Sequence, residues 1–275
     1  MSTGGGDFLA EMAERSRQRV VAAKRLRSES ALIELASSLP PSTPIRCSGG
    51  GFDLIAEIKL RSPAVGALRP VDDSIDARAV VYATAGAAAV SVLTEPSRFD
   101  GSMEHLQSAA RALSSLLVPA MRKDFLVDPY QVVEARVAGA GGVLLILRML
   151  SRTQLESLLH AARRFGLFAL LEAFDEKDIE LAHDLLAAHG VDGVLVGVNC
   201  RDLVTLQVVP GRLEPLARLL PASAPRVAES GVGTAADARA ASRAGYDFAL
   251  VGSALMRAAD PAALTRAMLD AGRKS

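Results

Sequence analysis

Short apolar runs alternate with longer amphipathic segments along most of the chain. Eight of these runs have the length and composition of buried β-strands. They occupy residues 52–58, 88–93, 118–121, 142–147, 167–171, 193–198, 226–228 and 248–251. The segments between them have the period of helices, and the runs recur roughly every 22 to 35 residues, as the strands of βαβ crossovers do. The pattern predicts eight strand–helix units.

Cap residues fall where these units need them. Residues that favour helix N-caps precede four of the helical segments: Asp72 with Asp73, Ser151, Asp175 and Thr234. Glycine allows the left-handed conformation that ends many helices. Ala-Gly pairs of this kind precede three strands, at Ala85-Gly86, Ala138-Gly139 and Ala244-Gly245.

Eight consecutive units in about 220 residues predict an α/β protein with the (β/α)8 TIM-barrel fold. An open, doubly wound sheet is the alternative, but the GxGxxG sequence that usually follows its first strand is absent. A helical pattern over residues 8–36 follows a flexible tail at residues 1–6, and prolines from Pro40 onward end it. We expect a tail and N-terminal helical extension over residues 1–45 and a catalytic barrel over residues 46–275.

The composition excludes several classes of partner. The 31 basic and 31 acidic residues balance, so neither nucleic acid nor an anionic membrane is expected. The one basic run, at residues 15–27, is interpreted as a solvated helix face, with an anion-facing rim as the alternative. Cys47 and Cys200 form no metal or disulfide motif, and because no apolar run reaches about 18 residues and the N-terminal residues lack an apolar core, we expect neither a membrane span nor a signal peptide. We expect a cytoplasmic protein that is a monomer or a weak homo-oligomer.

Polar residues gather where five of the predicted strands end, which is where catalytic groups lie in this fold. They are Glu57, Lys59, Arg122, Lys123, Asp124, Glu172, Asn199 and Glu229. One such charge is more often a solvated strand end or a structural ion pair, but five strands with the same feature indicate a site. The two-residue period puts Glu57 with Lys59 and turns Lys123 inward, so that Arg122 and Asp124 face the surrounding helices.

Proton transfer in this site is expected to depend on lysine and glutamate, because burial and neighbouring charges can shift their pKa values toward neutrality. All four histidines lie in helical segments and are interpreted as surface residues: His105, His160, His183 and His189. After the seventh and eighth strands, Gly231 and the pair Gly252-Ser253 lead into helices. Small residues there let backbone N–H groups approach an anion, which predicts a phosphorylated small-molecule substrate.

Seven segments together form a specific pattern. They read LIAEIKLRSP, SVLTEPSRFDGS, RKDFLVDPYQVVEARVAGAGGVLLI, LLEAFDE, VGVNCRDL, VAESGVGT and LVGSALMRAADP. The pattern, which extends from about Asp53 to Leu269, resembles the indole-3-glycerol phosphate synthase family of tryptophan biosynthesis. The resemblance implies a carboxy-lyase that needs no cofactor and no metal. Its substrate would be 1-(2-carboxyphenylamino)-1-deoxyribulose 5-phosphate, which closes a ring and loses CO₂ and water.

The resemblance also implies a role for each site residue. Lys123 matches the lysine that acts as the acid on the substrate carbonyl, Glu172 the general base, and Lys59 a second lysine that holds the substrate carboxylate. Glu57 and Asn199 match a supporting carboxylate and amide. Substrate binding is implied for Ser62, Phe99, Phe125, Arg201, Glu229 and Ser230, with the two phenylalanines as an apolar wall for the anthranilate ring. Phosphate binding is implied for Gly231, Gly252 and Ser253.

Four positions depart from the family pattern. Ala64 stands where a second serine is common, and Phe174 where histidine or asparagine is frequent. Residues 207–209 replace a more acidic run, and residues 49–51 are glycines in place of apolar residues. A paralogue in a specialised indole pathway is therefore an alternative. Two others are a phosphoribosylanthranilate isomerase-like enzyme, which calls for an Asp or Cys acid/base pair, and a non-catalytic phosphate-ligand-binding barrel, which should have lost its acid or its base.

Overall fold

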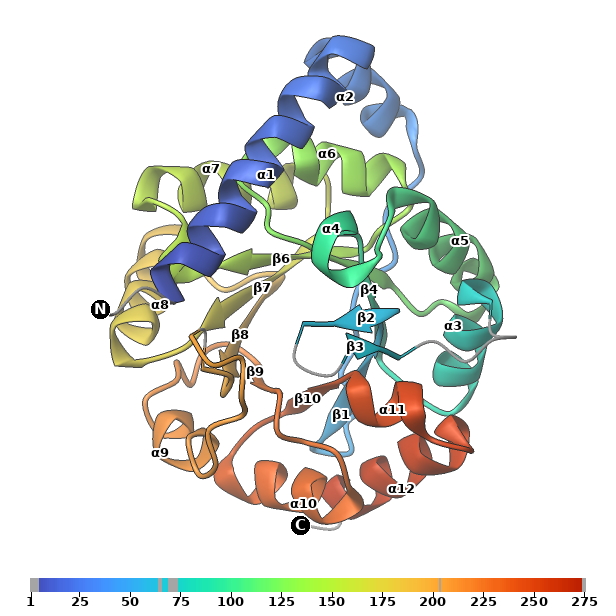
Figure 1. The fold of residues 1–275 in the computed structure, drawn as a ribbon, viewed down its shortest axis with the longest axis vertical. Coiled ribbons are helices and arrows are strands. Elements are labelled where there is room, and N and C mark those ends of the chain that lie inside the picture. The colour runs from blue at the N-terminus through green and yellow to red at the C-terminus, as the bar shows by residue number, and fades with distance from the viewer. Residues whose placement is uncertain (1–4, 64–65, 69–73, 203, 274–275) are drawn as a thin grey trace.

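The computed structural model describes residues 5–63, 66–68, 74–202 and 204–273. Within them, eight parallel strands close into a barrel in the order β1-β10-β9-β8-β7-β6-β5-β4. The strands are β1 (Asp53–Ile58), β4 (Ala89–Leu93), β5 (Ala120–Lys123), β6 (Gly142–Ile146), β7 (Phe168–Ala173), β8 (Val194–Asn199), β9 (Arg226–Glu229) and β10 (Phe248–Val251). Helices surround them (Figure 1). The predicted (β/α)8 TIM barrel is confirmed, with every strand end within two residues of its predicted position.

The surrounding helices follow the strands in turn. They are α3 (Ile75–Thr84), α5 (Met103–Leu113), α6 (Pro129–Val137), α7 (Arg152–Arg164), α8 (Glu176–His189), α9 (Leu213–Ala217), α10 (Ala235–Ala244) and α12 (Pro261–Arg273), with the short α4 (Pro96–Phe99) and α11 (Ser253–Arg257). Ser151, Asp175 and Thr234 cap α7, α8 and α10 as predicted. Asp72 and Asp73 lie outside the described residues, and Ser74 is the residue that caps α3.

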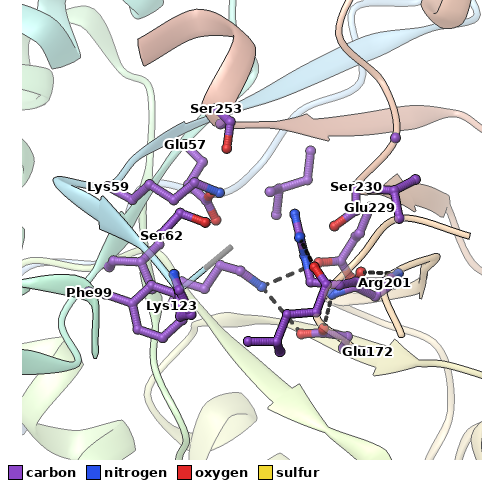
Figure 2. Close-up of a pocket in the computed structure, with 18 of the residues that line it drawn as sticks. Glu57, Lys59, Ser62, Phe99, Lys123, Glu172, Arg201, Glu229, Ser230 and Ser253 are labelled. Carbon is purple, nitrogen blue, oxygen red and sulfur yellow. Dashed lines mark hydrogen bonds and ion pairs between the residues drawn. The ribbon is translucent and has the colours of Figure 1, made fainter. Parts of the chain in front are cut away.

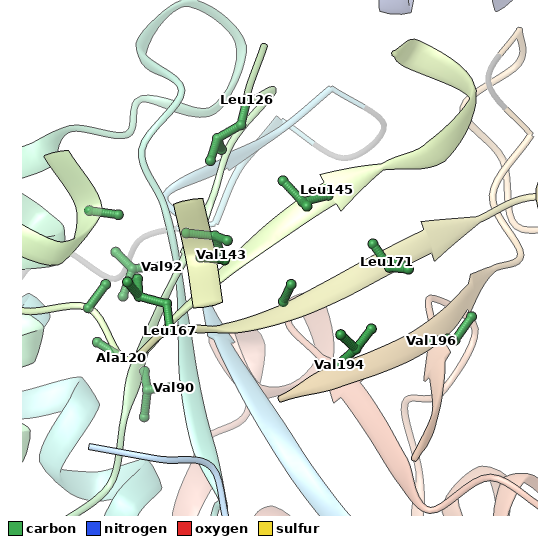
Figure 3. Close-up of a cluster of buried hydrophobic side chains, with 14 of the residues drawn as sticks. Val90, Val92, Ala120, Leu126, Val143, Leu145, Leu167, Leu171, Val194 and Val196 are labelled. Atoms are coloured by element: carbon green, nitrogen blue, oxygen red, sulfur yellow. The ribbon is translucent and has the colours of Figure 1, made fainter. Parts of the chain in front are cut away.

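Each strand divides its side chains between two hydrophobic clusters. One set faces outward beneath the helices and includes Val90, Val143, Leu171 and Val196 (Figure 3). The other set fills the barrel interior: Ile55, Ala89, Met121, Leu144, Phe168, Leu170, Leu195, Val227, Phe248 and Leu250. This division follows from the two-residue period of a strand. It fixes which charged residues at the strand ends face inward.

Strand β5 runs two residues further than the apolar pattern suggests. Its ladder with β4 continues through the charged residues, so that Arg122 pairs with Val92 and Lys123 with Leu93. Charged residues at the end of an apolar run resemble the beginning of a loop. Here Arg122 and Lys123 continue the strand, because the Lys123 side chain points into the carboxyl end of the barrel and the Arg122 side chain points outward.

The N-terminal extension consists of two helices in place of one continuous pattern. Helix α1 (Gly5–Leu26) lies diagonally beside the barrel near α6 and α7, and α2 (Glu29–Ser38) follows after a break (Figure 1). The Ser28 side chain caps α2 by accepting from the Ala31 N–H, which explains the break. Since α1 begins at Gly5, the last two residues of the predicted flexible tail are helical.

Two smaller features complete the fold. A short antiparallel hairpin, formed by β2 (Arg61–Ser62) and β3 (Gly66–Ala67), follows β1 and was not predicted. It carries Ser62 to the carboxyl end of the barrel. None of the helices in the described part of the chain has both the length and the apolar character needed to cross a membrane.

Candidate active site

One cavity of about 520 Å³ lies at the carboxyl ends of the barrel strands. All the residues that the sequence assigns to the site line it: Glu57, Lys59, Ser62, Phe99, Lys123, Phe125, Glu172, Asn199, Arg201, Glu229, Ser230, Gly231, Gly252 and Ser253. These residues come from β1, β2, β5, β7, β8, β9, the helices α4 and α11, and nearby loops. The fold therefore brings together a set that is spread over about two hundred residues of sequence.

Lys123 is at the centre of the site. Its Nζ lies 3.3 Å from Oε2 of Glu172 on β7 and 3.4 Å from Oε2 of Glu229 on β9 (Figure 2). Both glutamates are almost completely buried, at 3% and 1% exposure of their side chains. The ammonium is thus held between two carboxylates that belong to different strands.

A second lysine–carboxylate pair lies beside the first. The Nζ of Lys59 is 2.6 Å from Oε1 of Glu57, as the shared strand face predicts. Burial opposes ionisation of Glu57, but the charges of Lys59 and Lys123 outweigh it and hold the pKa of Glu57 below its ordinary value. Glu57 is therefore an ionised partner for both lysines.

The end of β8 positions Glu172 from the other side. The Asn199 side-chain NH₂ donates to Oε1 of Glu172 at 2.5 Å, and the Asn199 side-chain oxygen, Oδ1, accepts from the Arg201 backbone N–H at 3.0 Å. The Arg201 guanidinium in turn donates to the Leu206 backbone carbonyl. Glu172 therefore has one oxygen on the Asn199 amide and the other near the Lys123 ammonium.

The environment of the site favours the charged form of Lys123 but disfavours the charged form of Glu229. Burial opposes the charge of Lys123, but Glu172, Glu229 and Glu57 outweigh it and raise the pKa of Lys123. For Glu229, burial and then the negative charge of Glu172 raise the pKa to about 8. Three glutamates share two lysines, and burial beside Glu172 disfavours the charged form of Glu229.

An aromatic wall closes one side of the cavity. The rings of Phe99 and Phe125 lie 6.2 Å apart, and Phe8 of α1 makes an edge-to-face contact with Phe125 at 5.9 Å. Phe8 and the adjacent Leu9 line the cavity and were not predicted. The helical pattern of α1 shows which residues share a face, but it does not show what that face covers.

The opposite side of the cavity carries small residues and helix N-termini. Ser230 and Gly231 both have positive φ, 63° and 74°, and α11 begins at Ser253. Asp237 already accepts from the Gly233 and Thr234 N–H groups at the start of α10. Arg257, at the end of α11, also lines the cavity and was not predicted.

The side chains of Arg122 and Asp124 bond to the surrounding helices, as predicted, and Asp124 also borders the cavity. The Arg122 guanidinium donates to the Gln131 carbonyl at 2.8 Å and to Glu134 of α6 at 3.2 Å. Asp124 accepts two hydrogen bonds from Arg19 of α1, at 2.7 and 2.9 Å. The interpretation of residues 15–27 as a solvated face is therefore wrong for Arg19, because this residue anchors α1 to the barrel.

The remaining nucleophilic and metal-ligating residues lie apart from this centre. His105, His160, His183 and His189 belong to α5, α7 and α8, as predicted. Cys200 lines no part of the cavity and is buried, and burial raises the pKa of its thiol. Among the described residues, no group of three or more His, Cys, Asp or Glu side chains is arranged to hold a metal ion.

Two of the departures from the family pattern fall in the cavity. Phe174 is buried there, and the Arg148 guanidinium lies 4.8 Å from the centre of its ring. Gln207 and Val208 also line the cavity. Ala64 lies outside the described residues.

The model of a family described as indole-3-glycerol phosphate synthase matches residues 9–268. This chain belongs to the indole-3-glycerol phosphate synthase family. Curated relatives with that name include one from Mycolicibacterium smegmatis, 38% identical over 96% of this chain and 94% of its own, and one from Nocardioides sp., 42% identical over 88% and 91%. A Streptomyces coelicolor relative named indole-3-glycerol phosphate synthase 2 is 42% identical over 86% and 89%.

More distant solved structures share the fold of this indole-3-glycerol phosphate synthase family member. A thiamine phosphate pyrophosphorylase from Pyrococcus furiosus superimposes with a TM-score of 0.61 at 18% identity, covering 82% of this chain and 97% of its own. An orotidine 5'-phosphate decarboxylase from Pyrococcus horikoshii gives a TM-score of 0.55 at 15% identity, covering 80% and 99%. At these identities the likeness concerns the fold alone.

Proposed function

We propose that this chain converts 1-(2-carboxyphenylamino)-1-deoxyribulose 5-phosphate to indole-3-glycerol phosphate, CO₂ and water, as an enzyme of tryptophan biosynthesis. The observation that carries the proposal is the Lys123 ammonium, held 3.3 and 3.4 Å from two buried carboxylates in a cavity with an aromatic wall. Family membership gives the reaction, and this centre supplies the acid and the base that the reaction needs.

Lys123 is the proposed acid of the ring-closing step. A ring carbon of the substrate forms a bond to the ribulose carbonyl carbon, and the carbonyl oxygen takes a proton from the ammonium. The pKa of Lys123 is raised, which keeps the group protonated at neutral pH. The expected shift toward neutrality is therefore wrong for Lys123, because the neighbouring glutamates outweigh burial and make the ammonium a weaker acid. Donation from a fixed position as the new bond forms would lower the barrier to this step.

Loss of CO₂ and then of water would complete the reaction. The carbon–carbon bond to the carboxylate breaks, and the substrate's own ring nitrogen can accept the electron pair, so the chain needs no cofactor for this step. The new hydroxyl takes a proton from the Lys59 ammonium and leaves as water, and Glu172 is the proposed base that removes a proton from the adjacent carbon to form the indole double bond. The Asn199 amide supports this role, because it orients Glu172 from the side opposite Lys123.

Binding of the substrate would use the two ends of the cavity. The rings of Phe99 and Phe125 would contact the anthranilate ring, and Lys59 would hold the carboxylate. Because Asp237 occupies the amides at the start of α10, we assign the phosphate to Gly231, Gly252 and Ser253, with Arg257 as an added cation. Ser62, Arg201, Glu229 and Ser230 would contact the sugar chain between them.

The test is a direct assay of product formation. Purified protein is incubated with the carboxyphenylamino-deoxyribulose phosphate while indole fluorescence is recorded, for wild type, Lys123→Ala and Glu172→Gln. We expect indole product from the wild type and a loss of at least about 100-fold in each variant. A wild-type protein that forms no indole product would contradict the proposal. Full activity in one variant would contradict only that residue's role.

The isomerase alternative finds less support in the site. It calls for an Asp or Cys pair at the strand ends. The carboxylate of Asp124 is occupied by Arg19 and Thr94, and Cys200 is buried with a raised pKa. A non-catalytic barrel would not need the Lys123 and Glu172 pair, and both residues are present and in contact.

We also propose that the protein acts in the cytoplasm as a monomer or a weak homo-oligomer. The two cysteines support the location: both are free, one exposed and one buried, so neither contributes a disulfide. The most exposed apolar side chains support the weak-association proposal, because they come from three separate segments of the chain: Val21 with Leu26, Leu117, and Val204. Sedimentation at micromolar concentration tests it.

A further inference from the structure

We propose that Gly197 is a positioning residue: its missing side chain leaves a recess that lets the Glu229 carboxylate lie beside Lys123. The inference rests on the proposed function, because Lys123 is the acid there. It adds a residue that touches no substrate and that acts through Glu229.

Gly197 lies in β8 on the face that points into the barrel, beside Glu172 in one direction and Val227 in the other. A Cβ atom at this position would overlap Oε1 of Glu229. It would also lie 3.2 Å from Cδ of Glu229 and 3.2 Å from Cδ1 of Leu170. Gly197 is not among the glycines with positive φ, so the reason for glycine here is space.

The Glu229 carboxyl group is buried between Gly197 and Lys123. Its residue is 1% exposed, Oε2 lies 3.4 Å from the Lys123 Nζ, and Oε1 has no hydrogen-bond partner in the described part of the chain. Oε1 is the oxygen that faces Gly197. A methyl group at position 197 would therefore push the carboxylate toward the ammonium and displace Lys123 from its place between the two glutamates.

Strand β8 thus positions the carboxylates on both sides of Lys123 in two different ways. At Asn199 a side-chain amide holds Glu172 at 2.5 Å, and two residues earlier the absence of a side chain accommodates Glu229. A similar recess occurs at the second lysine: a Cβ on Gly252 would overlap the Glu57 carboxylate and lie 3.0 Å from the Lys59 Nζ. In each pair, a glycine on a neighbouring element makes room for the carboxylate.

The experiment is a double-mutant cycle between Gly197→Ala and Glu229→Asp, read as indole formation. Gly197→Ala alone should lower kcat roughly 10- to 100-fold, because small displacements of a catalytic group have effects of this size, while KM changes less than about threefold. Aspartate is one methylene shorter and retreats from the added methyl group. In the Glu229→Asp background the alanine should therefore cost less than about twofold.

Two controls separate this effect from crowding of the core. Leu170→Ala relieves the other contact of the new methyl group and should not restore kcat to Gly197→Ala. Gly142→Ala puts a methyl group in the same barrel interior, against the ring of Phe168 and away from the carboxylates. It should lower the melting temperature but leave kcat within about threefold of wild type.

The outcomes are distinct. Losses that multiply in Gly197→Ala/Glu229→Asp, or rescue by Leu170→Ala, would overturn the inference while wild-type activity keeps the proposed function. An inactive wild type would overturn the proposed function instead. If Gly197→Ala does not fold, the soluble yields of Gly197→Ala/Glu229→Asp and Gly197→Ala/Leu170→Ala decide. A soluble yield that recovers in the first double variant and not in the second supports the inference, and any other result overturns it.

Discussion

The two faces of strand β5 use neighbouring charges in opposite ways. On the outer face, every oxygen of Asp124 is occupied: Arg19 donates to both, and Thr94, Arg122 and the Phe125 N–H donate as well. On the inner face, Lys123 meets its two carboxylates at 3.3 and 3.4 Å, and one oxygen of Glu229 has no partner among the described residues. The outer charges are saturated and the inner ones are not.

The pKa values express the same difference. Burial opposes ionisation of Asp124, but Arg122, Arg19 and the Thr94 hydroxyl lower its pKa to about 2. Burial beside Glu172 raises the pKa of Glu229 to about 8. A saturated charge stabilises the fold, whereas a carboxyl group with an unpaired oxygen keeps bonding capacity that a substrate can use.

The largest effect on the inner face is expected from Lys123→Ala. Removal of the proposed acid should lower kcat/KM by 100- to 10,000-fold, up to about 5 kcal/mol of transition-state stabilisation. The measurement is steady-state indole formation. The matched control is Arg122→Gln, one residue earlier on the outer face, which should lower the melting temperature but keep turnover per folded molecule. A similar loss of turnover in Lys123→Ala and Arg122→Gln would contradict the proposed difference between the inner and outer faces.

On the outer face, Asp124→Asn should mainly destabilise the protein. It leaves the buried Arg122 and the partly buried Arg19 without their shared carboxylate, and breaking a buried ion pair costs about 3–5 kcal/mol. Urea unfolding measures this loss. The kcat of the folded variant should change less than about tenfold, because the carboxylate that is removed is bonded to Arg19, Thr94 and Arg122. A variant with wild-type stability and greatly reduced kcat would contradict this assignment.

Phe8→Ala tests the part of the cavity that α1 contributes. Loss of the edge-to-face contact with Phe125 should weaken binding by about 0.5–1.5 kcal/mol, which raises KM roughly 2- to 12-fold with little change in kcat. Phe165→Ala, which removes a ring at the end of α7, is the control. An unchanged KM in Phe8→Ala would show that the ring only packs against its neighbours.

The two faces should also give opposite slopes of stability with pH. Asp124 contributes stability that is present above its ordinary pKa of about 4 and is lost as the pH falls toward 2, so the wild type's advantage over Asp124→Asn should shrink in acid. Glu229 keeps its proton in the fold up to about pH 8, while the unfolded chain releases it near pH 4.5. Stability from this group therefore falls as the pH rises.

Melting temperatures of Glu229→Gln and wild type between pH 5 and 8 measure the second slope. The variant has no proton to lose, so its advantage over the wild type should grow with pH by on the order of a few °C. Midpoints of urea unfolding between pH 5 and 3 measure the first. If the contributions of Asp124 and Glu229 to stability changed with pH in the same direction, the proposed difference between the two faces of β5 would be wrong.

Local patterns predicted most of the fold and the chemical centre. Alternation and helical period fix the strands and the inward side of Lys123, because both depend only on neighbouring residues. The position of α1 was not predictable, since the partners of Arg19 and Phe8 lie about a hundred residues away. The break at Ser28 was missed because the helical pattern continues across it.

The roles of Gly197 and Gly252 were also beyond the sequence pattern. A glycine in a strand usually indicates a bulge or a close approach, and the neighbour that requires the space belongs to another strand. Arg257 was missed for a related reason, because only the fold of α11 brings it to the cavity. The role of such residues depends on neighbours that are distant in sequence, so the residues next to them in the chain do not reveal it.

The bond between Arg19 and Asp124 also has a consequence for protein synthesis. The two residues are 105 positions apart, and ribosomes add about 5–20 residues per second. Helix α1 therefore leaves the ribosome roughly 5 to 20 s before its anchor is made. During that interval Leu9 and Met12, which are buried in the finished protein, have no barrel to cover them. Helix α1, the first helix to be translated, therefore cannot reach its final position until β5 and Asp124 have been synthesised.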